Sequence, residues 1–185
     1  MSTTGPGQSL LLLLDVVTFL EEQGIEYGVV GALAASVHGI VRATTDADAL
    51  LSVSLSRLTR LAKMLRKAGM TAELHRGDSD DPIPALLAIS DQFGNRVDLL
   101  GGLRGLDPAA FERTLTVQFS GTALRIIGRE DFIAMKCFAG GPQDFADAEA
   151  TIRITDSPID LDLVRRITRR FGRPAADVLE RLLAG

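Results

Sequence analysis

Two aspartates, Asp46 and Asp48, stand at the beginning of the apolar segment 49–51. Side chains alternate between the two faces of a β-strand, so both carboxylates are expected on one face, about 6.6 Å apart along the strand. Carboxylate oxygens are ligands that Mg²⁺ prefers, and two such ions about 3.5–4 Å apart stabilise the attacking and leaving oxygens of a phosphoryl displacement. The pair therefore predicts a metal site that serves phosphoryl transfer.

A third aspartate strengthens this prediction. Asp98 lies in 96–100, a second short segment rich in apolar residues. Carboxylates near a core need compensating charge, which a metal ion would supply if the two segments were neighbouring strands. The alternatives are that Asp46 and Asp48 belong to a solvated loop and that Asp98 is an ordinary polar residue on the solvent face of its strand.

The elements that would position these carboxylates follow from hydrophobic periodicity and from glycine and proline breaks. The first half of the chain predicts helices at 10–23, 32–38 and 56–68, strands at 26–30 and 46–53, and a loop at 76–84. The second half predicts two hairpins, 85–90 with 96–100 and 114–119 with 123–127, and four helices at 130–139, 144–154, 159–171 and 174–183.

This order of elements predicts an α+β fold, in which helices pack on a mixed β-sheet and the C-terminal third is helical. We expect a flexible tail at 1–8, a core at 9–128 and a helical region at 129–185 that packs on the core in a single globular unit.

The composition of the 185 residues narrows the function classes. The net charge of −4 and the absence of Trp argue against a dedicated nucleic-acid binder, although the arginines of 165–173 could contact an RNA backbone. The apolar run 10–14 is interrupted by Asp15 and is far shorter than the roughly 20 residues of a membrane span. We therefore expect a cytoplasmic protein without a membrane partner. The single cysteine, Cys137, is expected to be a buried small hydrophobe.

The segment 27–51, YGVVGALAASVHGIVRATTDADALL, resembles the signature of the nucleotidyltransferase superfamily. That signature consists of a strand, a Gly-Gly or Gly-Ser pair, a short helix, and Asp-x-Asp on the next strand. The form with His-Gly, an Arg, a Thr and then Asp-x-Asp is similar to the branch that holds the AbiEii-like toxins of toxin–antitoxin systems and many uncharacterised bacterial relatives. The resemblance implies the polymerase-beta-like nucleotidyltransferase core.

A second stretch, EDFIAMKCFAGGPQDFAD at 130–147, is similar to the same branch, which carries a helical Lys followed by two spaced Asp residues. Lys136, Asp144 and Asp147 fall on those positions. The alternatives are a surface role for Lys136 and a helix-capping role for Asp144. Together the two stretches cover roughly residues 25–155.

The resemblance implies catalytic roles for Asp46, Asp48, Asp98 and Lys136, the three aspartates being the metal ligands. One or two Mg²⁺ ions are expected, and Mn²⁺ could replace them. Gly31 would let a triphosphate approach the N-terminus of a helix closely. The implied nucleotide-binding residues are Gly31, Ala32, Arg42, Thr45, Lys136, Asp144 and Asp147.

The function that follows is transfer of a nucleoside monophosphate from an NTP to an acceptor hydroxyl, with release of pyrophosphate. The acceptor could be a tRNA, a protein or a small molecule, and a toxin would have a cognate antitoxin as partner. Ala32 departs from the Gly or Ser of the signature and offers no hydroxyl to a phosphate. The alternative is therefore a catalytically degenerate member of the fold that binds a nucleotide or a partner.

Overall fold

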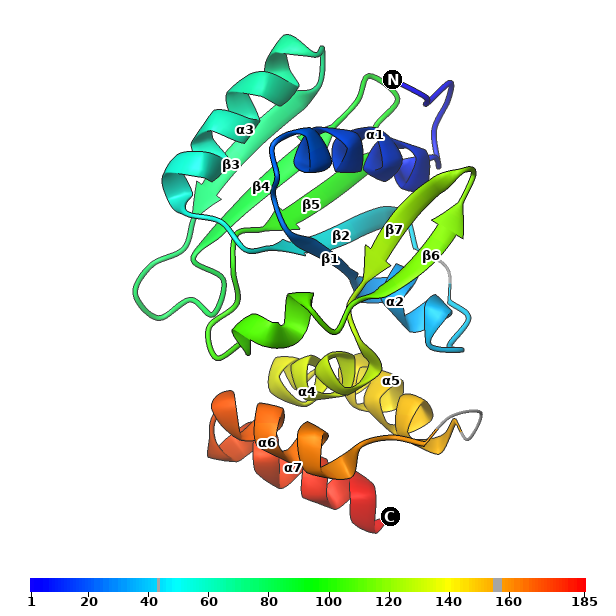
Figure 1. Cartoon of the computed structure of the whole chain (residues 1–185), viewed down its shortest axis with the longest axis vertical. Helices are drawn as coiled ribbons and strands as arrows, with labels where there is room; N and C mark the ends of the chain where they lie inside the picture. The colour runs from blue at the N-terminus through cyan, green and yellow to red at the C-terminus, as the bar shows by residue number, and fades with distance from the viewer. Residues whose placement is uncertain (43, 155–157) are drawn as a thin grey trace.

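The computed structural model describes residues 1–42, 44–154 and 158–185 of the chain, and within them the fold is α+β, as predicted (Figure 1). The helices are α1 (Ser9–Glu22), α2 (Gly31–Val37), α3 (Leu55–Lys67), the 3₁₀ turn η1 (Pro108–Phe111), α4 (Arg129–Ala139), α5 (Pro142–Arg153), α6 (Leu161–Arg170) and α7 (Arg173–Ala184). The strands are β1 (Tyr27–Val30), β2 (Asp46–Leu51), β3 (Thr71–Arg76), β4 (Ala85–Ser90), β5 (Arg96–Leu100), β6 (Leu115–Phe119) and β7 (Thr122–Ile126).

The strands of the described residues form one mixed sheet in the order β3-β4-β5-β2-β1-β7-β6. The two predicted hairpins, β4–β5 and β6–β7, are antiparallel pairs. The pairs β2–β5 and β1–β7 are parallel, whereas β1–β2 and β3–β4 are antiparallel. The pairing of β2 with β5 makes the Asp48 and Asp98 segments neighbouring strands, which was the condition for a shared carboxylate site, and it brings the N-terminal ends of the two strands together.

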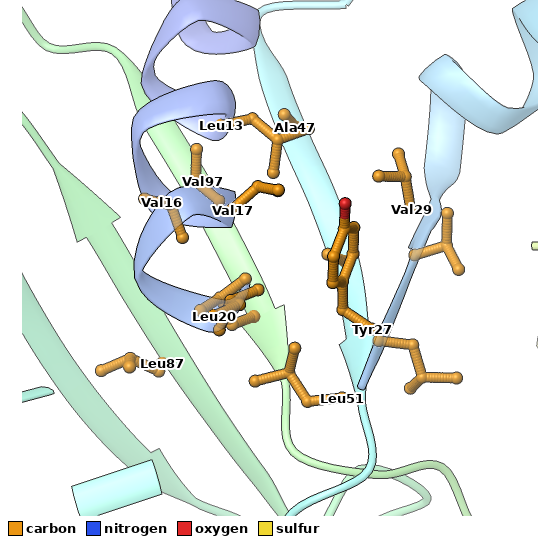
Figure 2. Packing of buried hydrophobic residues seen from close by; sticks show 14 of the residues in the cluster. Leu13, Val16, Val17, Leu20, Tyr27, Val29, Ala47, Leu51, Leu87 and Val97 are labelled. Atoms are coloured by element: carbon orange, nitrogen blue, oxygen red, sulfur yellow. The ribbon is translucent and has the colours of Figure 1, made fainter. Parts of the chain in front are cut away.

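One face of the sheet is covered by α1, whose apolar residues form the main core with alternate residues of the strands (Figure 2). Leu13, Val17 and Leu20 of α1 are fully buried beside Ala47 of β2 and Val97 of β5. Because side chains alternate along a strand, this burial turns the neighbouring polar residues of β2 and β5 to the opposite face. In residues 1–42, 44–154 and 158–185, none of the helices has the length and apolar character that crossing a bilayer would require.

The C-terminal helices α4 to α7 build a second, smaller cluster beyond the sheet (Figure 1). Its buried members are Ile133, Cys137, Ala148, Val164 and Leu179. Burial raises the pKa of the Cys137 thiol to about 12, so the thiol stays protonated near neutral pH and behaves as the small buried hydrophobe that was predicted.

The structure differs from the predicted elements at several places. β3 had no predicted counterpart, because Glu73 and His75 interrupt its apolar residues, although the inward alternation of Ala72 and Leu74 is typical of an edge strand. α5 begins two residues early, since Pro142 suits the first helical position.

The N-terminal eight residues, expected to form a flexible tail, make hydrogen bonds to the folded chain that include contacts with Asn95 and Asp15. The Asn95 Nδ2 donates to the Gly5 carbonyl at 2.9 Å, and the Asn95 Oδ1 accepts from the Gln8 N–H at 2.6 Å. The Ser2 hydroxyl donates to the Asp15 carboxylate at 2.7 Å.

Gly31 joins β1 to α2 with a φ of +64°, a left-handed conformation that favours glycine. A Cβ at this position would collide with the carboxylate oxygen Oδ2 of Asp48. The turn therefore needs a glycine both for its backbone conformation and for the close approach of the Asp48 side chain.

We predict that Gly31→Ala destabilises the protein by about 1–3 kcal/mol, because it adds backbone strain and displaces the Asp48 carboxylate. Chemical denaturation measures the change. Gly5→Ala is the matched control, since a Cβ there meets nothing within 4 Å. Equal stability of the two variants would contradict the assigned role of Gly31.

Candidate functional site

The three aspartates lie on one face of two adjacent parallel strands. In the register of β2 with β5, Asp48 is the direct partner of Asp98 and Asp46 is the partner of Arg96. All three carboxylate residues are half-buried. The parallel pairing therefore places Asp46, Asp48 and Asp98 together on the face that α1 does not cover.

Asp48 is the central carboxylate of this group. Burial, together with the charges of Asp46 and Asp98, raises its pKa to about 6, against the opposing influence of the Arg96 and Lys136 charges. The raised pKa of Asp48 therefore reflects its burial first and the two neighbouring carboxylates second.

Asp98 is already engaged by an arginine. The Arg96 Nε donates to Asp98 Oδ1 and the Arg96 Nη2 donates to Asp98 Oδ2, both at 2.9 Å. Asp46 is engaged by an uncharged side chain, since the Thr44 hydroxyl donates a hydrogen bond to its Oδ1 at 3.0 Å. Over the described part of the chain, the His, Cys, Asp and Glu side chains are not arranged as a ready-made metal cluster of three or more. The three carboxylates therefore share a face of the sheet but do not converge on a single position.

A second charged cluster is built by the C-terminal helices around Asp147 of α5. The Asp147 carboxylate is 1% exposed and forms ion pairs of 2.9 Å with both Lys136 Nζ and Arg42 Nη1. The Gln143 amide donates to its other oxygen at 2.9 Å. Lys136 also donates to Asp144 Oδ1 at 2.8 Å.

The electrostatics of Asp147 follow from these partners. Burial alone would raise its pKa, but the hydrogen bonds of Lys136 and Gln143 and the charges of Lys136 and Arg42 hold it below its ordinary value. Asp147 is therefore ionised near neutral pH. Since the Lys136 charge also lowers the pKa of Asp48, Lys136 links this cluster electrostatically to the three aspartates.

The remaining residues of the predicted nucleotide site have varied surroundings. Ala32 is buried in α2, and Gly31 lies against Asp48. The Thr45 side chain is exposed, and its carbonyl accepts from the Ser9 hydroxyl at 2.5 Å. Asp144 accepts from the backbone N–H of Gly141 at 3.2 Å, so it caps α5 as well as binding Lys136.

Three residues near these clusters were not predicted: Thr44, Arg96 and Gln143. Arg96 could have been found by alternation, because it lies two residues before Asp98 and so shares its face of β5. Gln143 lies four residues before Asp147, a spacing at which helical side chains meet.

The arginines of 165–173 are partly engaged within the fold. Arg165 forms an ion pair of 2.8 Å with Glu180, and Arg170 donates to the carbonyls of Gly105 and Leu106 at 3.3 Å.

Comparison with known proteins gives structural but not sequence relatives. No protein-family model matches the chain. No curated protein matches it either.

Solved structures do resemble it. An antigenic nucleotidyltransferase-like protein from Paracoccidioides brasiliensis is 14% identical, with a TM-score of 0.55 and coverage of 98% of this chain and 95% of that one. ANT(2″)-Ia in complex with adenylyl-2″-tobramycin is 13% identical, with a TM-score of 0.54 and coverage of 94% and 98%. A Thermotoga maritima protein, assumed to be a nucleotidyltransferase, is 11% identical, with a TM-score of 0.58 and coverage of 75% and 89%.

At these identities the likeness concerns the fold alone. In two of the three structures it extends over nearly the whole chain, and so over the sheet, which carries the three aspartates, and over the helical C-terminal part. The chain therefore has the nucleotidyltransferase fold.

Proposed function

We propose that this protein is a metal-dependent nucleotidyltransferase that moves a nucleoside monophosphate from an NTP to an acceptor hydroxyl. The bond between the α- and β-phosphates breaks, pyrophosphate leaves, and the acceptor oxygen, having lost its proton, bonds to the α-phosphorus. The observation that carries the proposal is the β2–β5 register, which sets Asp48 opposite Asp98 with Asp46 on the same face.

The donor set fits a hard divalent cation, because the residues are carboxylates and the charges of Asp46 and Asp98 repel that of the half-buried Asp48. Asp46, Asp48 and Asp98 would hold one or two Mg²⁺ ions, with Mn²⁺ as a substitute. When bound, such ions supply charge stabilisation for the attacking and leaving oxygens.

The protein's own cations would orient the nucleotide. Lys136 is 13% exposed and carries a positive charge within electrostatic reach of Asp48. It can bind a phosphate as a point charge, while Asp144 and Asp147 hold its amine in place. Gly31 leaves room beside Asp48 where a side chain would block approach. Arg42 would help to bind the nucleotide, either indirectly by holding Asp147 in place or directly by pairing with a phosphate.

The acceptor belongs to one of three classes. The similarity of 27–51 and 130–147 to AbiEii-like toxins supports tRNA, and a toxin of this kind would have an antitoxin partner. The structural likeness to ANT(2″)-Ia, solved with adenylyl-2″-tobramycin, supports a small molecule. A protein side chain is the third class. Separate incubations with α-labelled NTPs, Mg²⁺ and each acceptor pool identify which one receives the label.

A second candidate is a nucleotide- or partner-binding module without turnover. Two observations favour it: Ala32 provides no hydroxyl, and Arg96 occupies both oxygens of Asp98. Calorimetric binding of an NTP with no label transfer to any of the three pools would support the module. Absence of NTP binding would exclude both the enzyme and the nucleotide-binding module.

We predict that Asp48→Asn lowers the rate of label transfer at least about a hundredfold, because it removes the central metal ligand. Scintillation counting of the labelled acceptor measures the rate. Asp80→Asn, in the exposed loop before β4, is the control and should leave the rate unchanged. An active Asp48→Asn enzyme would argue against the carboxylate site.

The raised pKa of Asp48 predicts a pH dependence for binding of Mg²⁺ and NTP. Below about pH 6 this carboxyl is protonated and cannot act as a ligand, so affinity should fall as the pH drops through about 6. Calorimetric titrations at pH 5, 6, 7 and 8 test this. Asp48→Asn should bind weakly at every pH, and a wild-type affinity independent of pH would contradict the assignment.

Lys136→Gln should destabilise the protein by about 2–4 kcal/mol, because it removes a cation from the buried Asp147 carboxylate. Urea denaturation at pH 7 measures the loss. Adding Asp147→Asn should restore part of the stability but none of the NTP affinity. Recovery of NTP affinity in the double variant would show that Lys136 has only a structural role.

A further inference from the structure

Arg96 holds one of the three carboxylates of the proposed metal site. It lies two residues before Asp98 on β5 and opposite Asp46 of β2, so it is placed on the carboxylate face. Its guanidinium binds both Asp98 oxygens in a forked pair with two distances of 2.9 Å. The hydrogen bonds to Asp98, and then the charges of Asp98, Asp46 and Asp48, stabilise its charged form and raise its pKa.

This pair conflicts with metal binding. A divalent cation shared by Asp48 and Asp98 must approach the oxygens that already accept from Arg96, and the two positive charges repel each other. A planar guanidinium matches a carboxylate with two parallel hydrogen bonds, so Arg96 is a strong local competitor.

Arg96 also has space into which it can move. A hollow of about 190 Å³ on the β3–β4–β5 part of the sheet is lined by Thr71, Glu73, Ser90 and Arg96, among others. The Arg96 side chain is 53% exposed, whereas Asp98 is 14% exposed. The guanidinium can therefore leave Asp98 toward this hollow, where the Glu73 carboxylate and the Ser90 hydroxyl can accept its hydrogen bonds, while Asp98 stays in place.

We propose that Arg96 is a positioning residue that occupies Asp98 until a divalent cation displaces it into the hollow beside β3. Metal loading and the position of the Arg96 side chain are thereby coupled. The inference rests on the proposed metal-dependent function and deepens it, because it names a residue that sets the metal affinity of the protein in the absence of nucleotide.

The test measures Mn²⁺ affinity of the full chain without nucleotide, from the electron paramagnetic resonance signal of free Mn²⁺. Arg96→Met should bind Mn²⁺ about three- to tenfold more tightly than wild type, because the guanidinium that competes with Mn²⁺ for the Asp98 carboxylate is gone. Arg96→Lys keeps the charge but not the forked geometry, so it should also bind more tightly, by a smaller factor.

Two controls separate displacement from a general effect of charge. Arg76→Met removes one positive charge from an exposed residue at the end of β3 and should leave the Mn²⁺ affinity nearly unchanged. In an Asp98→Asn background Arg96 no longer faces a charged acceptor at position 98. Arg96→Met should therefore raise the Mn²⁺ affinity by no more than Arg76→Met does.

The outcomes distinguish failure of the inference from failure of the proposed function. Tighter binding by both Arg96 variants, lost in the Asp98→Asn background, supports displacement. Wild-type affinity in Arg96→Lys with tighter binding in Arg96→Met overturns it in favour of a simple field effect. Mn²⁺ binding that is abolished by Asp48→Asn but unchanged in both Arg96 variants overturns the inference alone. If wild type and both variants bind no Mn²⁺, the metal site and the inference both fail.

Discussion

The parallel pairing of β2 with β5 is the constraint on which the rest of the site depends. It sets Asp48 opposite Asp98, and because side chains alternate, it puts Asp46 and Arg96 on the same face. A shift of one residue in the register would turn the carboxylates toward α1, where Leu13 and Val17 are fully buried. The apolar core on one face therefore maintains the charged group on the other.

The protein compensates its buried and half-buried carboxylates unequally. Asp147 has Lys136, Arg42 and Gln143, and its pKa is held below the ordinary value. Asp98 has the forked Arg96. At Asp48 the charges of Arg96 and Lys136 lower the pKa by less than burial and the two neighbouring carboxylates raise it, so the pKa is raised to about 6. A bound cation would offset the burial of Asp48 and its repulsion by the two neighbouring carboxylates, which makes Asp48 the centre of the proposed chemistry.

Most of the fold could be predicted because its elements carry strong local signals. Leu58, Leu61 and Leu65 recur at helical spacing in α3, and the loop between β4 and β5 contains Gly94 at a φ of +79°. β3 was not predicted, because an edge strand with polar residues on its open face lacks a continuous apolar run. Pairing with β4, not local propensity, makes that segment a strand.

The sequence alone determined which charged residues are candidates for the site. The signals were the spacing of Asp46 and Asp48, the apolar surroundings of Asp98, and the position of Lys136 ahead of Asp144 and Asp147. Local spacing places side chains on a face, but it contains no information on which strands become neighbours. Only the tertiary structure decided three contacts. Arg96 donates hydrogen bonds to both oxygens of Asp98, Asp147 pairs with Arg42 from a loop 105 residues earlier, and Asp48 lies in close contact with Gly31. Those contacts depend on packing between segments far apart in the chain, and they set the electrostatics of the site.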